Sequence, residues 1–298
     1  MRVFVTGATG FIGSAVVKEL IAVGHQVLGL CRSDEKAAAL VAAGAEVVRG
    51  SLEDLESLKD GAARSDSVIH LAFNHDFSKL VANCEDDRRV ITALGSVLAG
   101  SGRPLIVTSG TGMVNTVPGQ PATEDGTVIT SAMIPRAASE EAAAAVAADG
   151  VNVSVVRLPQ VHDTVKQGLV TYAIAMAREK GVCAYVGNGH NRWPAAHVLD
   201  AARLYRLAIE KAEPGAKYHA VAEEGVPLRD IAEVLGRRLK LPVKSITPEE
   251  AEAYFGWLAM FAGLDVPASS AQTRKKLGWQ PTGPRLIADL EQLRGFDS

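Results

Sequence analysis

Short runs of β-branched and other apolar residues alternate with alanine-rich stretches over the first 160 residues. The apolar runs predict buried strands at residues 1–6, 26–31, 45–49, 67–72, 105–109 and 151–157. The stretches between them predict helices at residues 11–23, 35–43, 55–63, 84–100 and 139–148. Strands joined through single helices pair in parallel with right-handed crossovers. The pattern therefore predicts an α/β fold with a doubly wound parallel sheet.

The pattern changes after Pro159 and predicts a second, smaller unit. Residues 160–197 are interpreted as loop-rich around a single helix. The elements expected in this half are helices at 168–180, 199–211, 228–239 and 286–293 and a strand at 218–221. We therefore expect a first domain over residues 1–160, to which residues 198–222 return, and a smaller mixed domain over residues 161–298.

The composition and the net charge of the chain mainly exclude classes of protein. The chain has 298 residues, of which 47% are hydrophobic and 22% charged, with a formal net charge of −3. Without a basic surplus, a dedicated nucleic-acid binder is not expected, and no apolar run is long enough to predict a membrane span. The N-terminus passes directly into a glycine-rich turn, so we expect no signal peptide. Three widely spaced cysteines argue against a disulfide framework and for the cytoplasm.

The strongest motif lies between the first strand and the first helix, as Thr-Gly-Ala-Thr-Gly-Phe-Ile-Gly at residues 6–13. Gly7 permits a tight turn, Gly10 lets the backbone approach a pyrophosphate, and Gly13 lets the helix pack on the strand. The free N–H groups of the helix N-terminus then face the phosphates. This strand-turn-helix context predicts a dinucleotide site. The cofactor contacts expected in the turn are Gly7, Thr9, Gly10, Phe11, Ile12 and Gly13.

The residues after the second strand favour NADP(H) over NAD(H). An acid at this position would accept hydrogen bonds from the adenosine ribose, but the chain has Arg32 and Ser33 there. A guanidinium is planar and permanently charged, so Arg32 can pair with a 2′-phosphate while Ser33 donates a hydrogen bond. The alternative is that Arg32 is only a solvated surface side chain.

Further segments, together with the glycine turn, resemble the short-chain dehydrogenase/reductase superfamily in its extended, epimerase-like branch. The matching segments are Val-Ile-His-Leu-Ala at 68–72, Val-Thr-Ser at 107–109, Val-Arg-Leu-Pro at 156–159, Gly-Asn-Gly at 187–189 and His-Val-Leu-Asp-Ala-Ala at 197–202. The resemblance spans nearly the whole chain. It implies a Rossmann NAD(P)-binding domain followed by a smaller substrate-binding domain, and further cofactor contacts at Leu71, Ala72 and Pro159.

The chain departs from this superfamily at its acid. The resemblance implies a Tyr-x-x-x-Lys pair on the helix after the fifth strand, whose hydroxyl protonates the carbonyl oxygen. None of the five tyrosines of this chain has a lysine four positions on. In the register that the surrounding residues suggest, Arg136 takes the place of the tyrosine and Glu140 that of the lysine. The chain is therefore interpreted as an atypical member.

Other residues can supply the missing chemistry. Ser109 and Thr111 offer hydroxyl groups near the end of the fifth strand, although a structural role at the strand end is the alternative. His162 and Tyr172 follow the sixth strand and are candidate proton donors. Arg136 can polarise a carbonyl group but cannot release a proton near neutral pH. We expect His70, inside the fourth strand, to be a hydrogen-bonded core histidine.

Two functions from different classes remain open. The first is NADPH-dependent reduction of a small, hydrophobic carbonyl compound by hydride transfer, with an epimerase or dehydratase activity as a variant. The second is a non-catalytic NADP(H)-binding sensor or scaffold. The apolar residues 257–261 favour a hydrophobic substrate, but they are equally compatible with a core or a homodimer contact. No motif for a metal site, a serine hydrolase or a nucleoside triphosphatase occurs.

Overall fold

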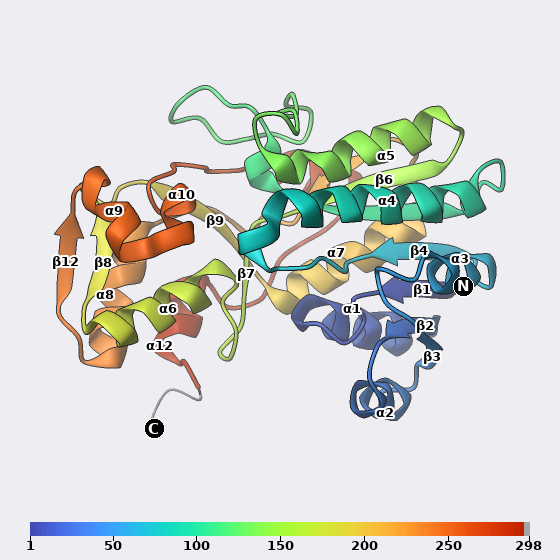
Figure 1. Ribbon diagram of the computed structural model, residues 1–298, viewed down its shortest axis with the longest axis horizontal. Helices are drawn as coiled ribbons and strands as arrows, with labels where there is room; N and C mark the ends of the chain where they lie inside the picture. The colour runs from blue at the N-terminus through green and yellow to red at the C-terminus, as the bar shows by residue number, and fades with distance from the viewer. Residues whose placement is uncertain (295–298) are drawn as a thin grey trace.

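A seven-stranded parallel sheet forms the centre of the molecule. The computed structural model describes residues 1–294, so positions 295–298 of the predicted C-terminal domain lie outside the described residues. The strands are β1 Arg2–Thr6, β2 Gln26–Cys31, β3 Glu46–Arg49, β4 Ser67–His70, β5 Pro104–Gly110, β6 Asn152–Leu158 and β10 Lys217–His219. They lie in the order β10-β6-β5-β4-β1-β2-β3, and all neighbours are parallel (Figure 1). The predicted doubly wound parallel sheet is confirmed.

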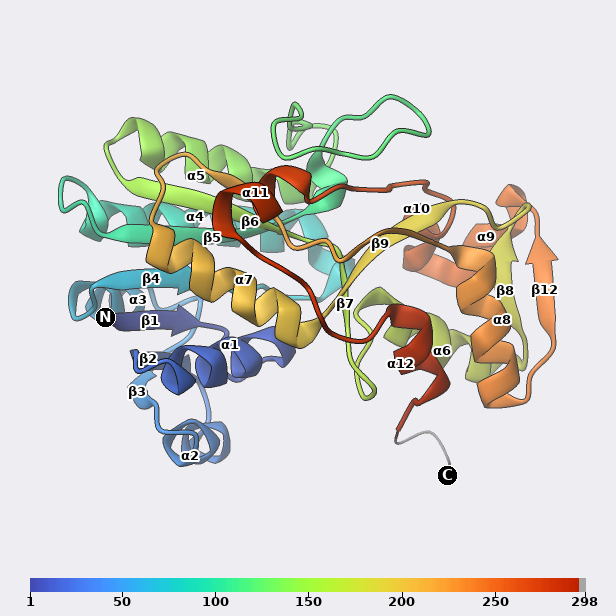
Figure 2. The ribbon, with the colours of Figure 1, turned by 180° about the vertical axis from the view of Figure 1, so that it is seen from behind.

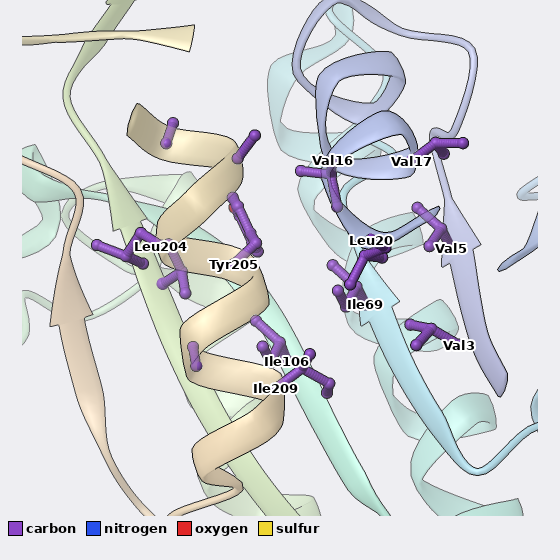
Figure 3. Close-up of a cluster of buried hydrophobic side chains, with 14 of the residues drawn as sticks. Val3, Val5, Val16, Val17, Leu20, Ile69, Ile106, Leu204, Tyr205 and Ile209 are labelled. Atoms are coloured by element: carbon purple, nitrogen blue, oxygen red, sulfur yellow. The ribbon is translucent and has the colours of Figure 1, made fainter. Parts of the chain in front are cut away.

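Helices cover both faces of this sheet. On one face α1 (Phe11–Ala22) and α7 (Val198–Lys211) pack side by side, and Leu20 and Tyr205 belong to the same buried cluster as Ile106 (Figure 3). The other face is covered by the helices α3 Leu55–Ala63, α4 Leu80–Leu98 and α5 Ala138–Ala148. The inner strands are therefore buried on both sides, which explains why they are recognisable as continuous apolar runs, whereas the edge strand β3 has exposed ends. The helix α2 (Asp34–Ala42) follows β2 and adds Leu40 to the first cluster.

The prediction of a loop-rich segment at residues 160–197 is wrong. Besides α6 (Leu169–Lys180), this segment holds the strands β7 Gln160–His162, β8 Cys183–Val186 and β9 Arg192–His197. The partners of β9 are β7, in parallel, and β11 (Glu223–Pro227), which is antiparallel. The partner of β8 is β12 (Val243–Ile246). Strands this short depend on distant partners, so local periodicity does not reveal them.

A second apolar core lies beside the carboxyl ends of the central strands (Figure 1). Its helices are α6, α8 Leu228–Leu239, α9 Pro248–Phe255, α10 Ala259–Ala262 and α12 Leu286–Glu291. The helix predicted at 228–239 has these bounds in the structure, and the one predicted at 286–293 ends two residues earlier. Leu258 is fully buried in this core, whereas Met260 is 51% exposed.

The C-terminal part of the chain returns to the central sheet before it reaches α12. The helix α11 (Ala271–Leu277) lies near α7 and β10, and the segment after it runs along α7 (Figure 2). Trp279 is fully buried and donates a hydrogen bond to the carbonyl oxygen of Asp200. The Asp200 carboxylate accepts hydrogen bonds from the backbone N–H groups of Thr282 and Gly283. This segment therefore ties the second core to the first.

Within residues 1–294, no helix combines the length and the apolar character that crossing a membrane requires. Over the same residues, no group of three or more His, Cys, Asp or Glu side chains is arranged to hold a metal ion.

Candidate functional site

The turn between β1 and α1 leaves no space for side chains at its glycines. Gly7 has a φ of +69°, and a Cβ atom there would lie 2.8 Å from the backbone nitrogen of Ala72. A Cβ atom at Gly13 would collide with the carbonyl oxygen of Gly7, and one at Gly10 would lie 3.1 Å from that oxygen. No side chain caps α1, so its first N–H groups are free to bind an anion. The other expected contacts of the turn are partly buried: Thr9, Phe11 and Ile12. A dinucleotide pyrophosphate requires a cradle of this form.

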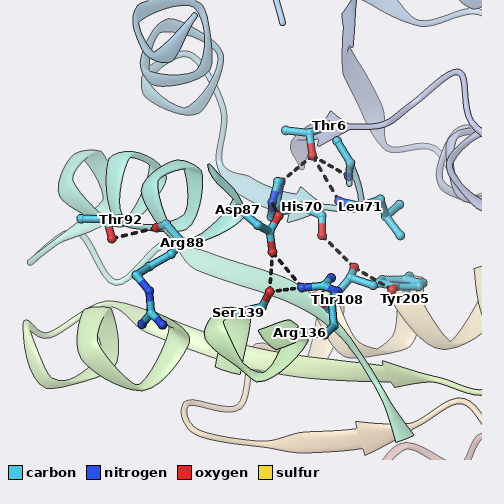
Figure 4. Close-up of polar contacts among 11 residues, drawn as sticks. Thr6, His70, Leu71, Asp87, Arg88, Thr92, Thr108, Arg136, Ser139 and Tyr205 are labelled. Atoms are coloured by element: carbon cyan, nitrogen blue, oxygen red, sulfur yellow. Dashed lines mark hydrogen bonds and ion pairs between the residues drawn. The ribbon is translucent and has the colours of Figure 1, made fainter. Parts of the chain in front are cut away.

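The strand order reverses between β1 and β4, and two side chains meet at this reversal. Thr6 is the last residue of β1, and its hydroxyl lies 2.7 Å from Nδ1 of His70, the last residue of β4. The same hydroxyl accepts hydrogen bonds from the backbone N–H groups of Leu71 and Ala72 (Figure 4). Open α/β sheets bind ligands at such a reversal. Thr6 thus holds two expected cofactor-binding residues against the glycine turn.

Asp87 of α4 connects this contact to the start of α5. Its carboxylate lies 2.8 Å from Nε2 of His70 and accepts hydrogen bonds from Ser139 and, at 3.0 Å, from Arg136 (Figure 4). Burial would raise the pKa of the Asp87 carboxyl, but His70, Arg136 and Ser139 outweigh burial and hold the pKa below its usual value. The prediction that His70 is a hydrogen-bonded core histidine is confirmed, and its partner is a buried carboxylate.

The guanidinium of Arg136 is held from several sides. One terminal nitrogen donates to Asp87 and Ser139, and the other donates to the carbonyl oxygen of Thr108 at 3.1 Å. The guanidinium also lies over the ring of Phe73, with its central carbon 4.1 Å from the ring centre. Three of its five N–H groups are used within residues 1–294, and the side chain is 20% exposed. Two N–H groups of Arg136 therefore have no partner among the described residues.

The hydroxyl groups at the end of β5 have different surroundings. Thr108 donates to the carbonyl oxygen of His70 and lies 2.8 Å from the hydroxyl of Tyr205. The Ser109 hydroxyl is buried and has no hydrogen-bond partner among the described residues. Thr111 is also buried and begins the short 3-10 helix Thr111–Met113. Catalytic roles for Ser109 and Thr111 stay predictions.

The two residues expected to select NADP(H) lie at the carboxyl end of β2. Arg32 is exposed, and its guanidinium makes no ion pair within the described part of the chain. Ser33 caps α2, where its oxygen accepts a hydrogen bond from the backbone N–H of Lys36 at 3.4 Å. A capping oxygen keeps its own proton available for donation.

His162 is completely buried. Its Nδ1 lies 2.7 Å from the Asp289 carboxylate of α12, and its ring meets that of His197 edge-on at 5.8 Å. Burial lowers the pKa of the His162 imidazole, and the hydrogen bond to Asp289 only partly opposes this. The structure therefore places this histidine away from solvent, and its role as a proton donor stays a prediction. Pro159, between β6 and β7, is partly buried.

Tyr172 lies on α6, is 36% exposed and belongs to a group of aromatic rings. Its ring centre lies 6.1 Å from that of Phe77 and 4.9 Å from that of Trp257. Phe77 begins the short 3-10 helix that leads into α4, so these rings come from both halves of the chain. Phe73 and Phe77 were not expected from the sequence, although the alternation of aromatic rings at 73, 75 and 77 was a usable signal.

Two buried ion pairs were not expected from the sequence. Asp87 belongs to a charged run that is typical of a solvated helix face, yet it is buried against His70 and Arg136. Glu140 forms a two-pronged ion pair with Arg157, with both N···O distances 2.8 Å and both side chains almost fully buried. The two positions that the resemblance assigns to an acid-base pair thus hold opposite charges, each with its own partner.

Comparison with known proteins agrees with this architecture. Residues 3–222 match the NAD dependent epimerase/dehydratase family. An uncharacterized protein of Schizosaccharomyces pombe is 49% identical over 97% of this chain and 98% of its own length. The decarboxylating sterol-4-alpha-carboxylate 3-dehydrogenase of Dictyostelium discoideum is 27% identical over 76% of this chain and 73% of its own.

Among solved structures, a double mutant of dTDP-glucose 4,6-dehydratase from Streptomyces venezuelae with NAD bound is similar in fold. Its TM-score is 0.78 at 18% identity, over 98% of this chain and 95% of that one. The glycine turn, the reversal at β1 and β4 and the match over residues 3–222 agree. The chain belongs to the NAD dependent epimerase/dehydratase family.

Proposed function

We propose that the protein is an NADPH-dependent oxidoreductase that reduces a small, apolar carbonyl compound. The observation that carries this proposal is the fixed guanidinium of Arg136 beside the carboxyl ends of β4 and β5, with two N–H groups left to donate. Such a group stabilises the negative charge that develops on a carbonyl oxygen. The family contains dehydrogenases as well as epimerases and dehydratases, and those relatives define the general reaction class.

The glycine turn, together with Leu71 and Ala72, would hold the pyrophosphate, and Arg32 and Ser33 would hold the 2′-phosphate of NADP(H). When bound, the reduced nicotinamide supplies the hydride. Arg136 donates hydrogen bonds to the substrate oxygen, and Asp87 keeps the guanidinium in place. Ser109 or Thr111 supplies a second hydrogen bond from the end of β5.

The proton for the product oxygen comes from Tyr172 or from water. Tyr172 is 36% exposed and contacts the rings of Phe77 and Trp257, whereas His162 is fully buried. Tyr172 is therefore the better candidate of the two predicted donors, because a proton donor must come within hydrogen-bond reach of the substrate.

The second candidate is a cofactor-binding sensor without turnover. The observation that favours it is the state of the site's polar groups: Arg136 cannot release a proton, and the hydroxyl of Ser109 and the ring of His162 are buried. An epimerase or dehydratase activity is a third candidate function within the family, and that activity also requires an acid-base pair.

Two measurements on one preparation separate these functions. NADPH binding is measured by calorimetry, and NADPH oxidation is followed against a panel of ketones and aldehydes. Turnover with any substrate supports the oxidoreductase, and tight binding without turnover supports the sensor. Replacing Arg136 with Met should lower kcat by about 10²-fold while leaving NADPH affinity unchanged. An unchanged kcat would remove Arg136 from the mechanism.

A further inference from the structure

A continuous row of aromatic side chains leads away from Arg136. The guanidinium lies over Phe73, and the ring centres then follow at 5.3 Å to His75, 6.1 Å to Phe77 and 4.1 Å to Trp257. Tyr172 meets Trp257 at 4.9 Å and Phe77 at 6.1 Å, edge-on in both contacts. We name the side chains of Phe73, His75, Phe77, Trp257 and Tyr172 the ring strip. It joins the segment after β4 to α6 and to the segment after α9.

The contact between Phe77 and Trp257 differs from the others in the strip. The two rings are nearly parallel, with an interplanar angle of 10° and centres 4.1 Å apart. They come from opposite halves of the chain, and each belongs to a 3-10 helix of three residues. Gly256, directly before Trp257, has a φ of +51°, which side chains rarely adopt. Contact between the two rings therefore joins two short segments from opposite halves of the chain.

We propose that the ring strip is a recognition surface for a planar, conjugated carbonyl compound, which stacks on the ring of Trp257. The carbonyl part of this proposal rests on the proposed function, whereas the recognition of a flat ring does not. Aromatic pairs favour stacked and edge-to-face contacts beyond the gain from burial alone, and Tyr172 is already placed edge-on to Trp257.

The chemistry of the strip argues against a nucleotide sugar as the ligand. None of its five side chains carries a permanent positive charge, which a diphosphate would need for strong binding. The adjacent guanidinium of Arg136 is compensated by the Asp87 carboxylate at 3.0 Å. The surface therefore favours an uncharged ring over a dianion.

The test compares two ketones of nearly equal size, acetophenone and cyclohexyl methyl ketone, on the full chain. KM and kcat are measured with NADPH, and Kd is measured calorimetrically with NADP⁺ bound. Fluorescence gives an independent signal, because Trp193 and Trp279 are buried and only Trp257 is partly exposed among the three tryptophans. Trp257→Leu removes the ring, and Trp257→Phe keeps a ring as the matched control.

We expect the aromatic ketone to have a KM and Kd about tenfold below those of the saturated one, and to change the emission of Trp257. Trp257→Leu should erase this difference by raising the aromatic ketone's values, with little change in kcat or in the values of the saturated ketone. Trp257→Phe should keep the difference. Equal affinity for both ketones, or equal losses for both in Trp257→Leu, would overturn the proposal even if both are reduced. If neither ketone is reduced, the proposed function fails for these substrates, while selective binding of acetophenone to the NADP⁺ complex still supports the ring strip.

Discussion

Replacing Asp87 with Asn tests whether the buried carboxylate holds Arg136 in position. The side chain of Asp87 is 2% exposed and accepts hydrogen bonds from His70, Ser139 and Arg136. Asparagine has nearly the same shape but carries no charge. The substitution therefore removes the counter-charge of Arg136 with little loss of packing.

The expected cost follows from the burial of this pair. Removing one partner of a buried ion pair costs about 3–5 kcal/mol. Arg136 remains 20% exposed and keeps its bond to the Thr108 carbonyl oxygen, so the lower end applies. We expect the free energy of unfolding to fall by about 3 kcal/mol, and the midpoint of thermal unfolding to fall by roughly 6–12 °C.

Urea denaturation at neutral pH measures this loss, and Asp86→Asn is the matched control. Asp86 is the preceding residue, its side chain is 46% exposed, and its ion pair among the described residues is with exposed Arg89, so its replacement should cost under about 0.5 kcal/mol. A double-mutant cycle with Arg136→Met should give a coupling of about 1–3 kcal/mol. If Asp87→Asn behaves like Asp86→Asn, or if the two losses simply add, the carboxylate does not hold Arg136.

Three other changes test separate parts of the site. Arg32→Ala should weaken NADPH binding by about 10- to 100-fold and leave NADH nearly unchanged in calorimetry, since a charge-assisted hydrogen bond contributes about 1.5–3 kcal/mol; equal losses would reject the NADP(H) assignment. Gly13→Ala should lower affinity for both cofactors at least tenfold, because its Cβ meets backbone, while Gly263→Ala, with nothing within 4 Å, should not. Burial and the charge of Arg157 lower the pKa of His219 from 6.5 to about 4. Between these two pH values the unfolded chain binds more protons than the folded chain, so the free energy of unfolding falls as the pH drops. In this pH range the free energy of unfolding of His219→Gln should fall less steeply than that of the unchanged protein, and the two slopes should differ by about 1.4 kcal/mol per pH unit. Identical slopes would contradict the argument.

The central sheet was predictable from sequence because its strands are buried on both faces. Residues 3–5 and 105–107, for example, are fully buried, and a strand in that environment is a continuous apolar run. The strands β7, β8 and β9 are short and contain polar residues and a proline, so nothing local distinguishes them from loops. They are held by strands such as β11 and β12, whose pairing is decided by tertiary structure.

The glycine turn was predictable for a similar reason, since its geometry excludes side chains at three positions. The polar network was not, because its members lie far apart in the sequence. Thr6 and His70 are separated by 64 residues, and His70 and Asp87 by 17. Within the run Glu-Asp-Asp-Arg-Arg at residues 85–89, only the structure distinguishes buried Asp87 from its neighbour Asp86, whose side chain is 46% exposed. Likewise, the sequence offered both His162 and Tyr172 as candidate proton donors, and the structure shows that they differ in burial.

The charged residues at the start of α5 help to decide between a working active site and a site that has lost its catalytic groups. In the register that the resemblance suggests, Arg136 and Glu140 stand in place of a hydroxyl and an ammonium group. Each charge has a buried partner: Asp87 lies 3.0 Å from Arg136, and Arg157 lies 2.8 Å from Glu140. A buried charge without a partner is costly, so these four side chains stabilise the fold only as two pairs. A site that had simply lost its acid would need neither pair, and apolar residues would fill the space at lower cost. The two ion pairs therefore favour an active site built around the fixed guanidinium of Arg136 over a site that has lost its catalytic groups.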